Sequence, residues 1–517
     1  MAPPPTTAAS HSASRRSLHR ASPALLCALA AAVAVAAVAW RTERFVPDDA
    51  YFYLVVARNL ARFGQHTFSG VFDTDGVHPL WTWMATAATW ALDHIEPRWV
   101  ASPRGLLALH YALLAVGAWT MATAARALGG SALLAGTVAT AFVATMAGLH
   151  TEAAASYVVL ALLSRAWLAA PRSVAGGTMV GALAAFAIFA RLDHGFLAVA
   201  ILFAWHRDAV HRRCTLAAWL AMAMPVATWL LWHRVAFGAW VPVSGWLKST
   251  APALCPSGIH VGGIASALSG WNLAAGWAPL AAMGLALHAS RGAQSRLRTL
   301  VWAFAIGCAL HAAQVALLTH HPASWLWYYV APVLGGTWAL VLAVRDRPAL
   351  GRWLAVSGAV VGAAYASWVA VRPTPQSEGA TVVAWLERQG NADATLLVSD
   401  SPGEIAFRTR HRVVALDLLT ANPRLAAQVH AAPDPTSPLF EAARRAGRPV
   451  QYLVVTTGTW LSAVRVAKDA QAIEIGFLRP GACRGRSWAS LPRLGRPLVR
   501  EPGLTVWKVG ADAGAKD

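Results

Sequence analysis

Repeated apolar runs are the feature that most constrains what this chain can fold into. Many of them are long enough to cross a bilayer, and the first, residues 22–40, reads SPALLCALAAAVAVAAVAW. Charged residues make up only 13% of the chain, whereas a soluble protein carries about 25%. The sequence therefore predicts a polytopic α-helical membrane protein.

The net charge of +19 would suggest nucleic-acid binding in a soluble protein. In a membrane protein, basic residues gather in cytoplasmic loops, so here the charge predicts topology instead. Residues 1–21 contain Arg and no acid, and we expect them to be a disordered basic cytoplasmic tail. The five cysteines form no CxxC pair, which excludes a zinc site of the usual spacing.

Short Arg-rich loops determine the predicted topology. Residues 206–213, 290–298 and 345–352 are expected to be cytoplasmic, because loops rich in Lys and Arg stay on that side. Alternation between them gives about eleven spans within residues 22–372, an inner N-terminus, an outer C-terminus and a first outer loop at 41–104. Residues 77–93 would begin and end on one side, so they are predicted to form an interfacial or re-entrant helix.

The composition changes after the last predicted span. Helical segments alternate with short apolar strands at Thr395–Ser399, Val413–Leu416 and 450–457. This pattern predicts a small extracytoplasmic α/β domain over residues 373–517. No internal repeat stands out, which argues against a transporter built from inverted repeats.

Two adjacent aspartates, Asp48 and Asp49, open the stretch DDAYFYLVVARNLARFG at the outer end of the first predicted span. One acid is enough to cap the following helix, so the pair predicts chemistry on one of them. The alternative is that both serve only as caps. Arg58 and Asn59 lie too far along the helix to cap it, and Arg58 either snorkels to lipid headgroups or belongs to a site.

Other polar groups are predicted at the same outer face. The motif ARLDHGF places Arg191 and Asp193 in an apolar run, either as a structural ion pair or as part of a site. The loop WVPVSGWLKST carries Lys248, which is either a solvated lysine or a phosphate ligand. An aromatic belt explains the adjacent Tyr328 and Tyr329 as well as ligand contact does.

Acids and cations on one membrane face suit a group-transfer reaction. A carboxylate can serve as the general base for a hydroxyl acceptor, while cations hold the phosphate of a lipid-linked sugar. Residue chemistry alone supports an outward-facing membrane site with an acid and phosphate-binding groups, and no further.

The order of the motifs resembles that of bacterial membrane glycosyltransferases of the GT-C superfamily. Within residues 40–420 these motifs are DDAYFYLVVARNLARFG, TDGVHPLW, GLHTE, ARLDHGF, PVSGWLK, WYY and DSPGEIAFRTRHRVVALDLLT. Relatives include protein O-mannosyltransferases, the lipid A aminoarabinose transferase and mycobacterial arabinofuranosyltransferases. The resemblance implies an inverting hexosyl or pentosyl transfer from a polyprenyl-phosphate donor to a glycan, lipid or protein hydroxyl. It also implies that transfer occurs at the periplasmic face of the bacterial inner membrane.

The resemblance further implies roles for individual residues. Asp49 would be the base and Asp48 would orient the acceptor or a neighbouring cation, although the two roles can be exchanged. Lys248, Arg191 and Arg58 would bind the donor phosphate. The residues expected to line the cavity are Tyr51, Asn59, Asp75, His78, His150, Glu152, Asp193, Tyr328 and Tyr329.

Two departures from the relatives bear on metal use. Relatives have Asn at the position of Asp75 and an acid at that of His150, for which Glu152 is the nearest substitute. The histidine favours chemistry without a cofactor. In the alternative, Asp48 and Glu152 would hold a divalent cation.

Two other classes of function stay open. A transporter or flippase of a lipid-linked saccharide would also need an outward acid and phosphate contacts. A non-catalytic assembly protein would keep the fold without the chemistry.

One covalent link is also predicted. Cys255 and Cys483 both fall outside the membrane in this topology. An oxidising periplasm would let them form a disulfide that tethers the tail over the site.

Overall fold

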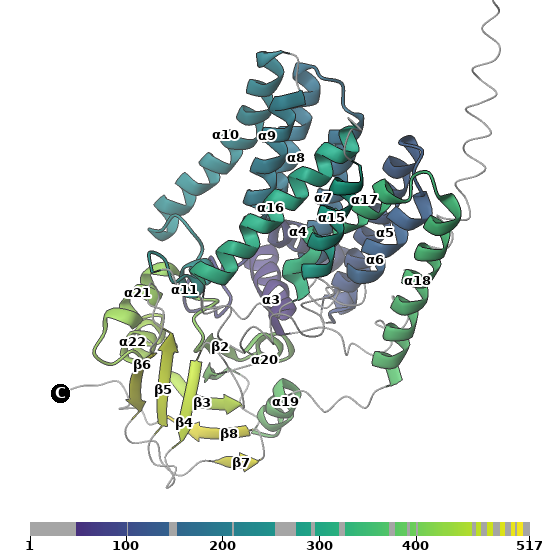
Figure 1. Cartoon of the computed structure of the whole chain (residues 1–517). Coiled ribbons are helices and arrows are strands. Elements are labelled where there is room, and N and C mark those ends of the chain that lie inside the picture. Colours follow the sequence, from purple (N-terminus) through teal and green to yellow (C-terminus); the bar gives the residue numbers. More distant parts are fainter. Residues whose placement is uncertain are drawn as a thin grey trace, which may run out of the picture.

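In the computed structural model of this chain, a bundle of helices carries a smaller sheet-containing part at one end (Figure 1). The structure describes residues 48–100, 102–143, 152–208, 211–253, 276–290, 295–319, 326–371, 378–389, 393–399, 402–456, 462–466, 473–478, 486–491, 498–501 and 504–509. The first predicted span, His150, Cys255 and Cys483 lie outside these residues, and the predictions made for them stay predictions.

Apolar helices form the bundle. Among the described residues, four helices are long and apolar enough to cross a membrane: α5 (Arg104–Ala127), α7 (Glu152–Ala169), α10 (Arg212–Phe237) and α16 (Arg296–Leu318). The other helices of the bundle are α6 (Ala132–Phe142), α8 (Val174–Ala190), α9 (Gly195–Asp208), α15 (Ala278–Ala289), α17 (Val330–Ala343) and α18 (Pro348–Val371). The chain is therefore a multi-pass membrane protein, as predicted, while the number and orientation of its spans stay predictions.

Small residues let the helices of the bundle approach closely. A Cβ on Gly177 or Gly181 of α8 would lie 2.2 or 2.0 Å from the carbonyl oxygens of Cys214 and Ala218 on α10. Glycines four residues apart on one helix face allow such contact between membrane helices. Helix α7 is buried along almost its whole length and packs against α5, α8 and α17.

Two helices and a loop precede the bundle. Helix α3 (Asp48–Phe63) is followed by a loop at 64–78 and by α4 (Pro79–Ile95), and these two helices pack side by side. Proline is favoured at the first position of a helix, and α4 begins at Pro79. The helix predicted at 77–93 is thus present, although its depth in the membrane stays a prediction.

The tail folds into helices and two sheets. Its helices are α19 (Glu378–Gln389), α20 (Pro402–Arg408), α21 (Pro423–Ala431) and α22 (Ser437–Arg445). The five-stranded sheet has the order β2-β1-β3-β8-β7, with bounds β1 (Thr395–Val398), β2 (Arg412–Ala415), β3 (Val450–Thr456), β7 (Val499–Glu501) and β8 (Leu504–Lys508). The three-stranded sheet joins β4 (Ser462–Val466), β5 (Ile473–Leu478) and β6 (Arg486–Leu491). Strand β1 runs parallel to β2 and β3, and α20 connects β1 to β2.

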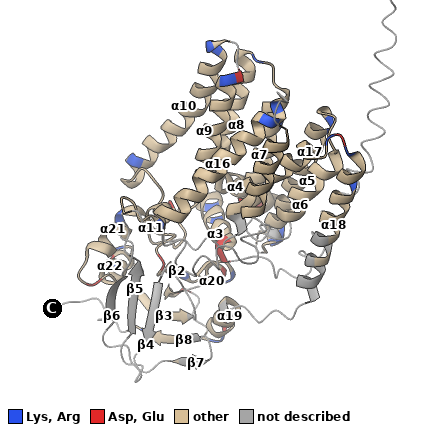
Figure 2. Cartoon of the chain, viewed as in Figure 1, with Lys and Arg blue, Asp and Glu red and all other residues tan. Residues whose placement is uncertain are grey.

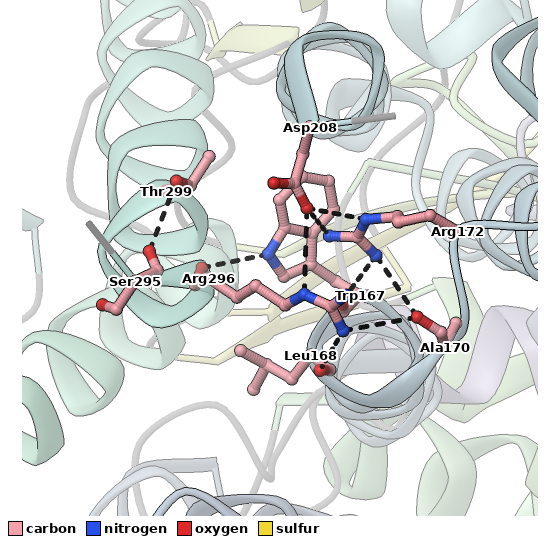
Figure 3. A network of polar contacts seen from close by, with 8 residues as sticks. All are labelled: Trp167, Leu168, Ala170, Arg172, Asp208, Ser295, Arg296 and Thr299. Carbon is pink, nitrogen blue, oxygen red and sulfur yellow. Dashed lines mark hydrogen bonds and ion pairs between the residues drawn. The ribbon is translucent and has the colours of Figure 1, made fainter. Parts of the chain in front are cut away.

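Basic side chains gather at the helix ends farthest from the sheets (Figure 2). There Asp208 accepts a hydrogen bond of 2.6 Å from Nε of Arg172, and Nε of Arg296 lies 3.8 Å from the same carboxylate (Figure 3). Trp167 donates to the carbonyl of Arg296 at 3.1 Å. Two of the loops predicted to be cytoplasmic, 206–213 and 290–298, therefore meet at one end of the bundle, together with Arg172.

Candidate active site at the tail-facing end of the helix bundle

One face of α3 binds the tail. The carboxylate of Asp48 accepts hydrogen bonds from the backbone amides of Gly403 (3.1 Å) and Glu404 (2.7 Å), at the N-terminus of α20. At the other end of α20, Arg58 donates to the carbonyls of Ala406 and Phe407, both at 3.1 Å. These contacts place both terminal nitrogens of Arg58 against the tail.

Two further predicted cavity residues, Tyr51 and Asn59, also form hydrogen bonds within the protein. Tyr51 is buried, and its hydroxyl accepts a hydrogen bond of 3.1 Å from Arg408 of α20. Asn59 donates to the carbonyl of Thr67 at 2.8 Å and so holds the loop that follows α3. Tyr51 thus contacts the tail, and Asn59 contacts the loop that follows α3.

Tyr53 lies on a different face of α3 and contacts His78, the residue before α4. The Tyr53 hydroxyl lies 3.4 Å from the backbone nitrogen of His78, and the two rings are stacked with centroids 6.4 Å apart. Burial raises the pKa of Tyr53, and the carboxylates of Glu152 and Asp49 raise it further while Arg191 lowers it. The charges of Asp49, Glu152 and Arg191 thus all act on Tyr53, and we call these groups, together with His78, one electrostatic neighbourhood.

Arg191 provides the cation of this neighbourhood. It follows the last residue of α8, and its Nε and Nη2 bind Asp193 at 3.1 and 2.9 Å. Its guanidinium carbon lies 4.4 Å from the ring centroid of Tyr328. The side chain is only 3% exposed, yet its Nη1 has no hydrogen-bond partner among the described residues. A buried guanidinium nitrogen of this kind is suited to bind an anionic group.

Asp193 is held by several cationic or hydrogen-bonding groups. Besides Arg191, Nε2 of His311 lies 3.2 Å and Nδ1 of His194 lies 3.9 Å from its oxygens. Burial alone would raise the pKa of Asp193, but Arg191 and His311 hold it well below the usual value. Arg191 and Asp193 therefore form the structural ion pair that the sequence left open, within the same neighbourhood as Asp49.

His78 and Lys248 are the remaining members of the group of charged and polar residues around Tyr53. Burial lowers the pKa of His78 to about 4, and the charge of Arg191 lowers it as well. Glu152 and Asp193 act in the opposite direction, and Lys248, the last residue of α11 (Val243–Lys248), lowers it slightly. His78 is consequently neutral at neutral pH, and Lys248 lies within electrostatic reach of it.

Asp75 has a structural position. Its carboxylate lies 2.8 Å from Nε2 of His233 on α10, and both of its oxygens are 3.3 Å from the amide of Val243. Burial raises the pKa of Asp75, against the effect of His233. Asp75 therefore ties the loop at 64–78 to the α10–α11 connection. Tyr329 packs against the hydrophobic core of the bundle.

The sequence predicted most of this neighbourhood but missed some of its members. The predicted residues that come together are Asp49, His78, Glu152, Arg191, Asp193, Lys248 and Tyr328. Tyr53 stands within the quoted aspartate stretch and His194 within ARLDHGF, so both could have been proposed. His311 lies within the apolar helix α16, where an ionisable residue is itself a signal of a functional site, so it could have been proposed as well.

The described residues include no cluster of three His, Cys, Asp or Glu side chains that could hold a metal ion. Asp48, one of the two predicted ligands, binds the amides of α20. What the set offers chemically is a carboxylate beside a buried guanidinium and a lysine. Such a set can accept a proton next to a bound anion.

Comparisons with known proteins bear on the fold. No family model and no curated protein matches the sequence. ArnT from Cupriavidus metallidurans, solved bound to undecaprenyl phosphate, matches with a TM-score of 0.52 and 15% identity, over 95% of this chain and 99% of that chain. The archaeal oligosaccharyltransferase AglB from Archaeoglobus fulgidus gives 0.47 and 13%, over 84% and 70% of the two chains. The arabinofuranosyltransferase AftD from Mycobacteria gives 0.44 and 15%, over 94% and 40%. The chain therefore shares its fold with ArnT, and its sequence motifs resemble those of the GT-C superfamily.

Proposed function

We propose that this protein is an inverting glycosyltransferase that moves a sugar from a polyprenyl-phosphate donor to a hydroxyl acceptor. The observation that carries the proposal is the buried Arg191, whose Nη1 has no hydrogen-bond partner among the described residues. It shares an electrostatic neighbourhood with Asp49 and Glu152. A fold like that of ArnT, which was solved with undecaprenyl phosphate, is further support.

The proposed reaction is a single displacement at the anomeric carbon. Asp49 takes the proton of the acceptor hydroxyl while its oxygen attacks the sugar carbon, and the bond from that carbon to the phosphate oxygen breaks. The electron pair leaves with the polyprenyl phosphate, and its growing negative charge is stabilised by Arg191 and Lys248. Attack opposite the leaving group inverts the anomeric centre.

Neutral His78 and Tyr53 supply hydrogen bonds without adding charge. The stacked pair lies between α3 and α4, next to both Asp49 and Arg191 in electrostatic terms. Hydrogen bonds to sugar hydroxyls from such rigid, buried groups would orient the donor for in-line attack.

The proposed partners and location follow from this chemistry. The donor is a lipid-linked sugar and the acceptor is a glycan, lipid or protein of the cell envelope. The reaction would take place at the periplasmic face of the bacterial inner membrane. We propose that no cofactor is needed, because Arg191 and Lys248 neutralise the leaving group. Transfer that is lost with EDTA and restored by a divalent cation would contradict this part.

A transfer assay tests the proposal. The full chain in lipid nanodiscs is given a panel of undecaprenyl-phosphate sugars and acceptors, and transferred sugar is measured. General-base catalysis is worth about 10²- to 10⁴-fold, so Asp49→Asn should lower kcat by that factor. The matched control is Asp93→Asn, since Asp93 pairs with the exposed Arg62 on the same two helices.

Three outcomes would oppose the proposal. Transfer that survives Asp49→Asn at equal protein level would show that Asp49 is not the general base. Movement of a lipid-linked sugar across the bilayer without transfer would identify a flippase. Absence of both, with every donor, would favour a non-catalytic assembly protein.

A further inference from the structure

Helix α20 of the tail is held by α3 at both of its ends. Asp48 accepts two amide hydrogen bonds at the N-terminus of α20, and Arg58 donates two at its C-terminus. A helix carries a partial positive charge at its N-terminus and a partial negative charge at its C-terminus, so an acid at the start and a base at the end both stabilise it. The two charges therefore fix the position of α20 along α3.

The contact is too close for any residue larger than glycine. A Cβ on Gly403 would lie 2.4 Å from the backbone oxygen of Asp48 and 2.9 Å from the ring of Phe52. Both distances are shorter than normal van der Waals contact. Gly403 consequently lets the tail reach the backbone of the helix that carries Asp48 and Asp49.

Helix α3 also shares its hydrophobic core with the tail. The buried residues Phe52, Val55 and Val56 belong to one cluster with Val398 of β1 and Ile405 of α20. In Figure 1, α20 lies between α3 and the sheet. The tail is thus part of what holds α3 in place.

The tail touches other elements that carry the candidate site. A Cβ on Gly76, two residues before His78, would lie 1.7 Å from the carbonyl oxygen of Leu419. Trp246 of α11, two residues before Lys248, packs against His430 of α21 with ring centroids 5.6 Å apart. The tail therefore contacts α3, the first outer loop and α11.

We propose that Asp48 is a positioning residue that acts through α20, so that the docked tail sets the orientation of Asp49 beside Arg191. This inference rests on the proposed transferase function. It separates the two adjacent carboxylates: Asp49 reacts, whereas Asp48 holds the tail that keeps Asp49 in place. Asp48 needs only hydrogen-bond acceptor oxygens for this role.

Four variants of the full chain test the proposal in the transfer assay. Asp48→Ala and Gly403→Ala disrupt the same contact from opposite sides, so each should lower kcat by about 10- to 100-fold, a typical cost of misplacing a reacting group. The double variant should be no slower than the slower single variant, because the two changes act on one contact. Asp48→Asn keeps an acceptor oxygen for one of the two amides but turns its NH2 group toward the other, so its kcat should lie between those of Asp48→Ala and the wild type.

A reacting Asp48 would give a different pattern. Asp48→Asn would then be as inactive as Asp49→Asn, while Gly403→Ala would stay active. Effects of Asp48→Ala and Gly403→Ala that multiply in the double variant would also overturn the proposal.

Hydrogen exchange separates this inference from the proposed function. In the full chain, Asp48→Ala and Gly403→Ala should both speed amide exchange of α20, whereas Asp49→Asn should leave it slow. Unchanged exchange in Asp48→Ala would overturn the proposal whatever the activity. Fast exchange together with unchanged kcat would show docking without a role in positioning, which also overturns it. A wild type that transfers no sugar but shows the expected exchange pattern would overturn the proposed function and the positioning role, while leaving the docking contact established.

Discussion

Asp48 and Asp49 are neighbours in the sequence, but the structure gives them different surroundings. Successive residues of a helix point about 100° apart, so adjacent side chains face different neighbours. Asp48 binds the amides of α20. Asp49 contributes to the field around Tyr53, together with Glu152 and Arg191. At this scale, the direction of each side chain decides its role.

Arg191→Lys tests the phosphate role. Lysine keeps the charge but cannot bind Asp193 and an anion with separate nitrogens of one planar group. We expect the KM for the donor to rise by about 10- to 100-fold, as for loss of a charge-assisted hydrogen bond. Arg62→Lys, on the exposed side of α3, is the matched control and should leave KM unchanged. An unchanged KM in Arg191→Lys would contradict the assignment.

His78 should make stability depend on pH. Its pKa falls from 6.5 to about 4 on folding, mainly because it is buried. Between these values the unfolded chain binds a proton that the folded chain excludes. Stability should therefore fall as the pH drops from 6.5 to 4, by up to about 3 kcal/mol. Thermal unfolding of wild type and His78→Gln at pH 7 and pH 4.5 measures this, and equal losses in both proteins would contradict it.

At the scale of elements, the loop at 64–78 joins the bundle to the tail. Asp75 binds His233 and the amide of Val243 on the bundle side. On the tail side, Asn422 donates to the carbonyl of Asp73 at 3.3 Å. The loop is therefore held from two sides, and its contacts decide where His78 lies.

Gly76→Ala tests this placement. The added Cβ would lie 1.7 Å from the carbonyl oxygen of Leu419, so the loop or the tail must shift. Overpacking of this kind costs roughly 1–3 kcal/mol, and the midpoint of thermal unfolding should fall. Gly245→Ala on α11 is the control, because an added Cβ there meets nothing within 4 Å. The idea fails if both variants unfold at the wild-type temperature.

At the scale of the whole molecule, the tail and the candidate site lie at one end of the bundle and the basic loops at the other (Figures 1 and 2). At the basic end, Arg172 stacks on Trp205 with its guanidinium carbon 3.9 Å from the ring centroid. Asp208 lies between Arg172 and Arg296 and ties three loops together. This network stabilises the end of the bundle away from the site.

Asp208→Asn should therefore affect stability and leave the chemistry alone. The change leaves Arg172 and Arg296 close together without the carboxylate between them. Asp208 is 39% exposed on its side chain, so we expect a loss of only about 1 kcal/mol. Thermal unfolding and the transfer assay measure the two effects separately. A kcat reduced as much as by Asp49→Asn would place this network in the reaction.

Local patterns were enough to predict much of the fold and part of the site. Long apolar runs predicted the helices of the bundle, and alternation of short apolar strands with helices predicted strands β1 to β3. Ionisable residues in apolar surroundings marked Asp49, Glu152 and Arg191, because such groups are costly unless they have a purpose. The contacts of Arg58 and Tyr51 with the tail were not predicted, because a sequence does not show which face of α3 meets the tail.

The sequence by itself determined that the chain inserts many helices in a membrane, since hydrophobicity and charge are properties of local segments. It also indicated an outer site with acids and cations. Only the tertiary structure decided which of these groups meet. Asp48 and Gly403 are separated by hundreds of residues, as are Gly76 and Leu419, and their contacts depend on how the tail packs on α3 and the first outer loop. Packing between distant segments therefore decides which polar residues hold the tail and which lie at the candidate site.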